Sequence, residues 1–307
     1  MSTTLETLSN DLAAAVERAG RSVVAIHARR RIPSSGVVWR TGLVVAADHT
    51  VHKDDDIEIG LDGGRSSRAT LVGRDPSTDL CLLRLADGAK VEPASSTHAE
   101  PRVGQLALAT GRPGSDVTAS FGVISAVGPE WRTWRGGKVD RFVRLDVAVY
   151  DGFSGAAVAN AAGQLIGIAT SGLSLAAAIA IPATTVDRVV DSLLAGGGRT
   201  GRGYLGIGTQ PVRIPESVRG RLAPIGGEVP RVGLLVVAVQ PDAPADRAGV
   251  LLGDLLVALG DEAVADPRDV LAALGPDSVG RTLAATLVRA GAPITVQLSV
   301  AEHPRRD

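Results

Sequence analysis

The sequence is poor in several residue types that mark particular classes of protein. Cys81 is its only cysteine, which excludes an internal disulfide and a cysteine-built zinc site. Aromatic residues make up 3% of the chain, and 32 basic against 33 acidic side chains leave a net charge of -1. Because no charge of one sign dominates the chain, we expect no nucleic-acid partner.

Long hydrophobic runs are also missing. No stretch is apolar and long enough to span a bilayer, and the N-terminal residues lack the basic and continuous apolar regions of a signal peptide. We therefore expect no membrane span and a cytoplasmic location for the chain as it stands, or a periplasmic one if the chain is truncated. The 45% of apolar residues is typical of a globular protein, and 307 residues suffice for two domains.

The spacing of apolar residues changes along the chain. Within residues 1–19, leucines and a valine recur at helical spacing, which predicts an amphipathic helix. Residues 20–195 contain many short apolar runs separated by Gly, Pro, Asp and Ser, with a helical pattern only near their end. Closely spaced short strands predict a mainly β domain, either an antiparallel sandwich or a pair of barrels.

A second domain is expected after a glycine-rich segment. GGGRTGRG, residues 196–203, predicts a flexible linker. Residues 204–301 combine strands with one well-marked helix, for which Asp266 is the N-cap and Pro267 the first residue. We expect a small α+β domain here, followed by a tail at residues 302–307.

One serine lies between two glycines in the apolar run VYDGFSGAAV, and this Ser154 is a candidate nucleophile. A nucleophilic serine needs a base and a carboxylate that orients the base. His49, which ends the apolar run VVAADH, and Asp79, where a loop enters the strand CLLRL, can supply them. The chain order His, Asp, Ser is that of chymotrypsin-like proteases. Taken singly, each residue also has an ordinary interpretation as a turn serine, a strand-end cap or a polar strand end.

A metal site is the other chemistry that the histidines suggest. His49 and His52 are three positions apart, a spacing that metal sites use. No cysteine and no obvious third ligand accompany them. We therefore expect neither a metal nor a cofactor.

Four segments in register resemble the HtrA (Deg) family of trypsin-fold proteases. SSGVVWRTGLVVAADHTV is similar to the family's GSG…TNxHVV region, GRDPSTDLCLLRL to its GxDxxxDLAxLK run, and DGFSGAAVANAAGQLIGIAT to its GNSGGPLxNxxGxxIGIxT run. GYLGIG, followed by GLLVVAVQPDAPADRAGVLLGDLLVALGDEAV, resembles the family's PDZ domain. The resemblance covers about residues 20–300.

This resemblance implies a mainly β fold: a double β-barrel trypsin-like protease domain plus a small α+β PDZ domain. It implies an ATP-independent serine endopeptidase that degrades unfolded or damaged proteins, with His49, Asp79 and Ser154 as its triad. The backbone N–H groups of Gly152 and Ser154 would stabilise the oxyanion. Family members form trimers through their protease domains, so a homotrimer is the expected assembly.

The segment GYLGIG predicts a peptide-binding site in the second domain. The N–H groups of Leu205, Gly206 and Ile207 can point into one concavity and take up the carboxylate of a C-terminal peptide. The strand that starts at Ile207 offers an edge for the peptide, and the helix from Pro267 forms the other wall. Pro211 cannot donate to a ladder, so only about three or four peptide residues pair before it. A groove filled by the chain itself is the alternative.

Two departures from the family pattern keep a second function open. Phe153 stands where the family has Asn or Asp before the serine, and Ala156-Ala157 stand where it has Gly-Pro. These changes leave the triad in place but can alter how the loop settles. The alternative is a catalytically attenuated homologue that acts as a PDZ peptide-binding or chaperone-like protein.

Overall fold

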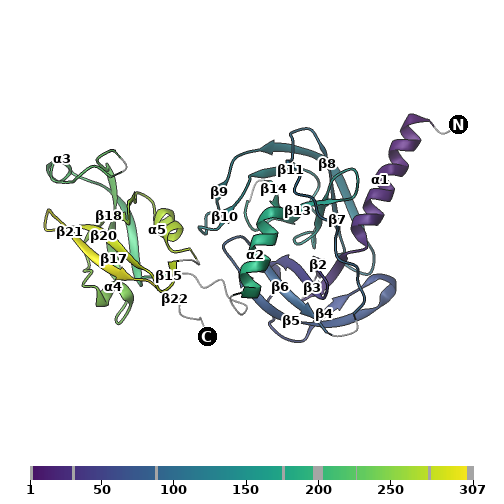
Figure 1. Ribbon diagram of the computed structural model, residues 1–307, viewed down its shortest axis with the longest axis horizontal. Coiled ribbons are helices and arrows are strands. Elements are labelled where there is room, and N and C mark those ends of the chain that lie inside the picture. Colours follow the sequence, from purple (N-terminus) through teal and green to yellow (C-terminus); the bar gives the residue numbers. More distant parts are fainter. Residues whose placement is uncertain are drawn as a thin grey trace. The chain divides into compact units, whose positions relative to one another are not determined.

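The computed structural model describes residues 3–29, 32–86, 89–174, 177–195, 203–225, 227–275 and 278–302. Most of the chain divides into two compact units, the first of residues 1–133 and 137–200 and the second of residues 201–307 (Figure 1). Residues 196–202 of the predicted linker and 303–307 of the predicted tail lie outside the described residues. Gly203 and Glu302, which the prediction gave to the linker and the tail, pair with each other in strands of the second unit.

The first unit contains a closed barrel of antiparallel strands in the order β1-β2-β3-β6-β5-β4. Its strands are rich in Val, Ile and Leu, which favour a pleated and packed surface. Ile26, Val44 and Leu83 are buried in its interior. The elements are β1 (Val23–His27), β2 (Ser34–Arg40), β3 (Leu43–Ala47), η1 (Asp48–Thr50), β4 (Ile57–Gly60), η2 (Asp62–Gly64), β5 (Ser66–Asp75) and β6 (Leu80–Leu85).

A second closed barrel follows in the same unit, in the order β11-β14-β13-β12-β7-β8, beside a two-stranded hairpin of β9 and β10. The two barrels confirm the prediction of a double-barrel, mainly β fold. The elements are β7 (Leu106–Gly111), β8 (Thr118–Val127), β9 (Trp131–Arg132), β10 (Lys138–Val139), β11 (Val143–Asp146), β12 (Ala157–Ala159), β13 (Leu165–Thr170) and β14 (Ala178–Pro182).

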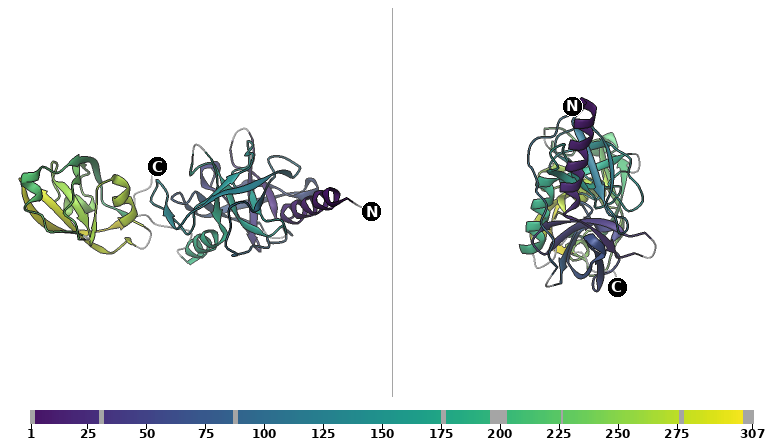
Figure 2. Two further views of the ribbon diagram at one scale, coloured as in Figure 1. Left: turned by 90° about the horizontal axis from the view of Figure 1, so that it is seen from above. Right: turned by 90° about the vertical axis from the view of Figure 1, so that its right-hand side faces the viewer.

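Two helices accompany the barrels. Helix α1 (Thr4–Gly20) opens with a capping box between Thr3 and Glu6, and its buried residues lie only in its C-terminal part. Its first turns therefore stand away from the barrels (Figures 1 and 2). Helix α2 (Ala183–Ala195) continues directly from β14 and is buried along one face.

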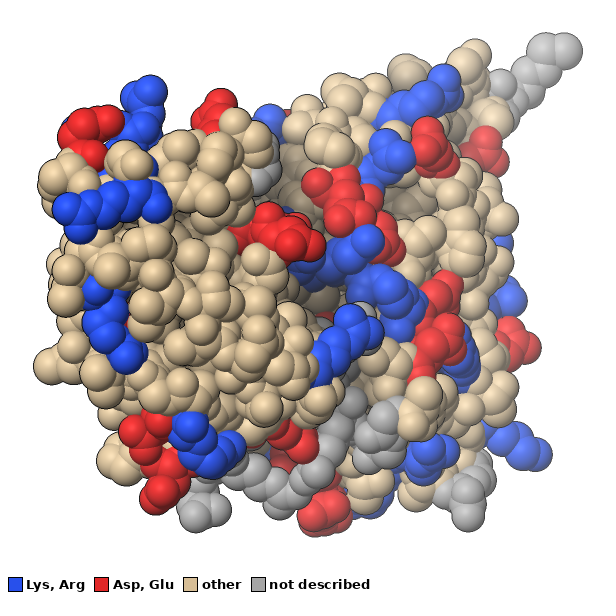
Figure 3. All heavy atoms as spheres, turned by 60° about the vertical axis from the view of Figure 1, so that its left-hand side comes forward, with Lys and Arg blue, Asp and Glu red and all other residues tan. Residues whose placement is uncertain are grey.

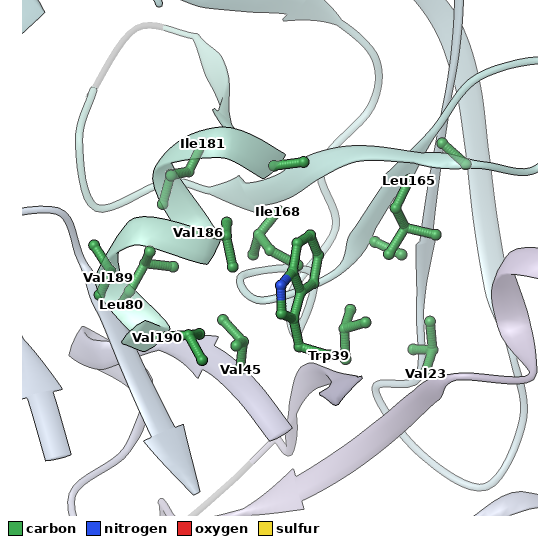
Figure 4. Packing of buried hydrophobic residues seen from close by; sticks show 14 of the residues in the cluster. Val23, Trp39, Val45, Leu80, Leu165, Ile168, Ile181, Val186, Val189 and Val190 are labelled. Carbon is green, nitrogen blue, oxygen red and sulfur yellow. The ribbon is translucent and has the colours of Figure 1, made fainter. Parts of the chain in front are cut away.

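One hydrophobic cluster joins both barrels and both helices. Trp39 of β2 lies among Val45 of β3, Ile168 of β13 and Val186 of α2 (Figure 4). The indole N–H of Trp39 donates to the Asp187 carboxylate at 2.7 Å, so the ring buries its apolar surface without losing a hydrogen bond. Each fully buried large side chain stabilises the fold by roughly 1.5–3 kcal/mol. This cluster fixes the barrels against each other and so fixes any site built from both.

The second unit is a mixed α+β domain around a sheet in the order β16-β17-β18-β20-β21, with β16 at one edge. Helix α5 packs against that edge strand, and its Asp266 cap and Pro267 start are as predicted. The elements are β15 (Gly203–Tyr204), β16 (Ile207–Arg213), α3 (Glu216–Arg219), β17 (Val232–Val239), α4 (Pro244–Arg247), β18 (Leu255–Leu259), β19 (Glu262–Ala263), α5 (Pro267–Ala273), β20 (Thr282–Arg289), β21 (Ala292–Ser299) and β22 (Ala301–Glu302).

Three local predictions need correction. His49 does not end a strand, because β3 stops at Ala47 and His49 lies in the short helix η1. The run FVRLDVAVY, which its apolar pattern predicts to be one strand, is a strand only over Val143–Asp146, and its second half leaves the barrel as a loop. Strand β4 was missed because its alternating IEIG pattern follows the charged run KDDD. Charges of both signs are interspersed on the face of the molecule that Figure 3 shows.

Candidate active site

The pairing of two strands brings His49 to Asp79. β3 and β6 are antiparallel with Ala47 opposite Leu80, so the residues just outside this pair also face each other. The N–H of Asp48 donates to the Asp79 carbonyl at 3.1 Å, and the N–H of His49 donates to Asp79 Oδ1 at 3.0 Å. The turn of η1 then directs the imidazole back onto the same carboxylate.

The Asp79 side chain is buried, with 1% of its surface exposed, and a buried carboxylate needs partners. His49 Nδ1 lies 2.8 Å from Oδ2 and 3.0 Å from Oδ1, and the hydroxyl of Thr170 at the end of β13 also donates to Oδ2. The backbone of Asp79 has a φ of 60°, a left-handed conformation that costs a non-glycine residue on the order of 1 kcal/mol. The hydrogen bonds hold the residue in this strained geometry.

These contacts determine the proton arrangement on His49. An ionised carboxylate only accepts hydrogen bonds, so Nδ1 must carry the proton that it donates to Asp79. In the neutral ring, Nε2 is then unprotonated and can accept a proton. The His49 side chain is 30% exposed, so its outer edge is accessible.

Ser154 comes from the second barrel, in the loop between β11 and β12. Phe153 anchors this loop: its ring is fully buried and stacks edge-on against Tyr150, with ring centroids 5.2 Å apart. Gly152 has a φ of 90°, and a Cβ there would lie 2.6 Å from Pro113 Cβ and 2.7 Å from the Pro33 carbonyl oxygen. Only glycine fits that position without strain. Because its ring is buried, Phe153, which stands where the family has Asn or Asp, holds the loop in the core.

The backbone N–H groups of Gly152 and Ser154 are the predicted donors to the oxyanion. Among the described residues, no backbone carbonyl accepts a hydrogen bond from the N–H of Gly152 or of Ser154. The neighbouring N–H groups of Phe153 and Gly155 do have such acceptors, Tyr150 at 3.0 Å and Ala169 at 2.8 Å. Alternate N–H groups of this run, those of Phe153 and Gly155, are thus hydrogen-bonded to backbone carbonyls.

The hydroxyl of Ser154 lies 3.0 Å from that of Ser171, the residue after β13. Gly172 follows, and a Cβ on it would lie 2.5 Å from Asp79 Oδ2 and 2.8 Å from His49 Nδ1. Thr170, Ser171 and Gly172 thus contact all three predicted triad residues. Sequence reasoning missed them, although the hydroxyls and the glycine that follow the apolar run LIGIA are a usable signal for a strand end that faces a polar site.

The fold gives His52 a structural contact. Its Nε2 lies 3.1 Å from the carbonyl oxygen of His49, which orients the ring toward the backbone. Across the described ranges, no group of three or more His, Cys, Asp or Glu side chains could hold a metal ion.

Cys81 is buried in the first barrel, and burial, with a smaller contribution from the Asp48 carboxylate, raises the pKa of its thiol. The thiol therefore stays protonated and acts as a small apolar side chain.

The predicted carboxylate-binding residues lie just before and at the start of the edge strand β16. Leu205 is buried in the core of the second unit, and its carbonyl accepts the Ala245 N–H at 2.9 Å. Gly206 has a φ of 77°, and its carbonyl accepts the Gln240 N–H at 2.8 Å. Ile207 is the first residue of β16, whose strand partner is β17. The turn is therefore rigid and leads into an edge.

Comparisons with known protein families agree with this architecture. A family model for the trypsin-like peptidase domain matches residues 34–168, and one for the PDZ domain matches residues 203–300. A probable periplasmic serine endoprotease, DegP-like, from Rhizobium meliloti is 36% identical over 90% of this chain and 54% of its own length. The chain thus spans about half the length of the DegP-like relatives that it matches. Serine endoprotease DegS of Escherichia coli K12 is 28% identical over 94% of this chain and 85% of its own.

Solved structures give the same result. A variant of the HtrA-type protease AlgW with a tripeptide is 30% identical, with a TM-score of 0.72 over 95% of this chain and 97% of that one. A serine endoprotease from Yersinia pestis is 28% identical, with a TM-score of 0.73 over 99% of this chain and 100% of that one. Helices with the length and hydropathy needed to cross a bilayer are not found in the part of the chain that the structure describes.

Proposed function

The chain belongs to the HtrA/Deg family, in which a trypsin-like protease domain is followed by a PDZ domain, and we propose that it is an ATP-independent serine endopeptidase that degrades unfolded or damaged proteins. The observation that carries the proposal is the His49–Asp79 pair, with Nδ1 at 2.8 Å from Oδ2, beside a nucleophile loop anchored in the second barrel. Unfolded segments suit such a site because they reach it in an extended conformation.

The proposed reaction is acyl transfer to Ser154. Its Oγ attacks the scissile carbonyl, His49 Nε2 takes the hydroxyl proton and then returns it to the leaving amine, and Asp79 stabilises the imidazolium. The N–H groups of Gly152 and Ser154 donate to the oxyanion. Water then hydrolyses the acyl-enzyme with His49 again as the base. Thr170 adds a donor to Asp79 and keeps that carboxylate oriented toward His49.

Casein cleavage and labelling with a fluorophosphonate probe test this proposal. We expect Ser154→Ala to abolish labelling, and Ser154→Ala, His49→Ala and Asp79→Asn each to reduce cleavage by roughly 10³ or more, without additive effects, because the three residues act as one unit. Ser120→Ala, in strand β8, is the control for a serine outside the site. Unchanged cleavage in Ser154→Ala would refute the mechanism. An unlabelled wild type would favour the attenuated homologue that binds peptides without cutting them.

For the second unit we propose capture of C-terminal peptides. Leu205, Gly206 and Ile207 supply the N–H groups for the carboxylate, and β16 supplies the edge for the peptide strand. The support is the position of this turn at the start of an edge strand against which α5 packs. The AlgW structures carry a tripeptide or a decapeptide, and we infer that peptides are ligands of this chain as well.

A homotrimer assembled through the first unit is also proposed. Leu5 is 77% exposed and Leu8 is 47% exposed on α1, while Ala15 and Ala19 of the same helix are buried. A second copy that covers these leucines would remove apolar surface from water. Size-exclusion chromatography with light scattering measures the mass of the assembly, which should equal that of three chains. The double substitution Leu5→Ser and Leu8→Ser should lower this mass to that of one chain. An unchanged mass in the variant would show that α1 is not part of the interface.

The cellular location stays a prediction. The sequence predicts a cytoplasmic location for the chain as it stands and a periplasmic one if the chain is truncated, and the Rhizobium relative is named as a periplasmic protein. Fractionation of the source cells, followed by detection with an antibody, measures which compartment holds the protein.

A further inference from the structure

Ser35, the second residue of β2, makes an unusual set of contacts with the nucleophile loop. It belongs to the first barrel and is fully buried. Its backbone N–H donates to the Gly152 carbonyl at 2.9 Å, and its hydroxyl donates to the same carbonyl at 2.7 Å. The hydroxyl oxygen also accepts the N–H of Arg112 at 2.9 Å. One serine thus holds both lone-pair directions of a carbonyl in the other barrel.

The direction of these bonds is fixed by their partners. A carbonyl oxygen only accepts and a backbone N–H only donates, so the single hydroxyl proton of Ser35 must point at Gly152. Arg112 is itself immobile: its side chain is buried, and its guanidinium donates to the carbonyls of Val23 at 3.0 Å and Ser115 at 2.6 Å. The donor that fixes Gly152 is therefore oriented by a rigid neighbour.

The clamped carbonyl lies between the two proposed oxyanion donors. The Gly152 N–H precedes the Gly152–Phe153 peptide plane, and the Ser154 N–H follows it. A peptide unit is planar, so holding its carbonyl leaves only the adjacent φ and ψ angles free. Glycine restricts those angles least, and Gly152 is thus the residue at which the loop most needs an external restraint.

The packing around Ser35 leaves little free space for its side chain or for the nucleophile loop to move. A Cβ on Gly155 would overlap the Ser35 carbonyl oxygen, and a Cβ on Gly111 would lie 2.8 Å from the Ser35 hydroxyl oxygen. The nucleophile loop, the end of β7 and the start of β2 therefore close around this one side chain. Nothing in this packing brings Ser35 into contact with the reacting atoms.

We propose that Ser35 is a positioning residue for the oxyanion hole, acting through the Gly152 carbonyl. It holds the Gly152–Phe153 peptide in the orientation that aims the N–H groups of Gly152 and Ser154 at one point. The inference rests on the proposed protease function. Its effect falls on the transition state, in which the oxyanion exists, more than on substrate binding.

The test compares Ser35→Ala with the wild-type chain in steady-state peptide hydrolysis and in binding of a peptide aldehyde, which forms a tetrahedral adduct. Loss of one oxyanion donor costs roughly 10²–10³ in kcat, and loss of a restraint on two donors should cost about tenfold or more. We expect kcat and aldehyde affinity to fall together by this factor, with KM changed by less than about twofold.

Two further variants keep the test decisive. Ser35→Cys keeps a side chain of similar size with a weaker donor, and should give a kcat between those of the wild type and Ser35→Ala; it also serves if Ser35→Ala fails to fold. Ser22→Ala removes another buried hydroxyl, one that donates to the Ala19 carbonyl at 3.0 Å, and should leave kcat unchanged. Wild-type kcat and aldehyde affinity in the folded Ser35 variants would overturn the inference. Absence of Ser154-dependent turnover in the wild type would instead overturn the proposed function.

Discussion

The hydroxyl of Ser154 is hydrogen-bonded to the hydroxyl of Ser171 at 3.0 Å. Between the described residues His49 and Ser154 the structure gives no hydrogen bond, whereas His49 is bonded to Asp79 at 2.8 Å. The proposed base is therefore oriented, while the proposed nucleophile is turned to another partner. In the proposed mechanism, a rotation of the Ser154 side chain precedes attack, and the hydrogen bond to Ser171 opposes that rotation.

Ser171→Ala should speed the reaction of Ser154 with a fluorophosphonate probe. A hydrogen bond between neutral groups contributes about 1 kcal/mol, which corresponds to roughly a fivefold change in rate. Ser171 is exposed, so its truncation leaves the core intact. The second-order rate constant for labelling is the measurement, and Ser171→Thr, which keeps a hydroxyl, is the matched control. A slower reaction in Ser171→Ala would mean that Ser171 assists the nucleophile.

Gly172→Ala should inactivate the enzyme without unfolding it. The added Cβ would lie 2.5 Å from Asp79 Oδ2 and 2.8 Å from His49 Nδ1, so the pair must move apart. A displacement of this kind in a catalytic group costs about 10²-fold in rate. Casein cleavage and thermal unfolding measure the two effects. Gly114→Ala, which would meet nothing within 4 Å, is the control and should keep full activity. Full activity in Gly172→Ala would show that the pair can shift without loss.

Cleavage should follow small or branched apolar residues. From the sequence we expect residues 146–153 and 168–182 to form the walls of the specificity pocket, and Asp146, Val147, Val149 and Ala178 from these stretches line one cavity. Arg144 lines it too, so the charges of Arg144 and Asp146 offset each other and the cavity has no net charge that would favour Lys or Arg over apolar side chains. We expect most cuts in casein after Val, Ala, Ile or Leu. Mass spectrometry of the fragments identifies them, and a majority of cuts after Lys or Arg contradicts the prediction.

The β-rich character of the first unit could be predicted from the sequence because most of its strands are short apolar runs bounded by turn residues, whereas the choice of two barrels over a sandwich came from the family resemblance. The triad candidates followed from a resemblance in register, since each of the three motifs that contain them is a short, continuous stretch of sequence. The contacts of Ser35, Thr170 and Ser171 could not be predicted in this way. They depend on how two barrels pack and on side-chain rotamers at a strand end, and neither leaves a periodic pattern. The same limit explains why the strand before Ser154 was predicted too long: its valines line a loop.

Acid should destabilise the second unit through Asp254. Its carboxylate is buried; burial raises its pKa, but hydrogen bonds from Arg289, at 2.8 and 2.7 Å, and from the Leu251 N–H outweigh this and leave the pKa lowered. A lowered folded-state pKa gives stability that is present above the unfolded value of about 3.9 and is lost as pH falls through the folded value.

Calorimetric unfolding of the full chain between about pH 6 and pH 2 measures this loss. The melting temperature of Asp254→Asn should be below that of the wild type near neutral pH, because Arg289 loses its charged partner, and the gap should close below about pH 3.9. Asp261→Asn, at an exposed position, is the control. A gap that stays constant over the whole range would show that Asp254 contributes through packing alone.

A free C-terminal carboxylate should determine peptide binding to the second unit. Three N–H groups, from Leu205, Gly206 and Ile207, are proposed to bind it, and hydrogen bonds to a charged group contribute about 1.5–3 kcal/mol each. Peptides that end in Val, Leu or Phe should bind the full-length Ser154→Ala chain with micromolar affinity and, in the wild type, should raise the peptidase rate. Amidation should weaken binding at least about tenfold.

The length of the bound peptide gives a second measure of the same site. β16 is an edge strand that contains Pro211, opposite Leu234 of β17, and a proline has no N–H to donate to an added strand. Lengthening the peptide beyond about four residues should therefore add little affinity, because only that many residues pair before Pro211. Calorimetric titration of a free peptide, its amidated twin and a longer form makes the comparison. Gly206→Ala, whose Cβ would overlap Ala243 Cβ, should abolish binding of all three. Equal binding of the free and amidated peptides, or of neither, would exclude carboxylate capture and assign this unit a structural or assembly role.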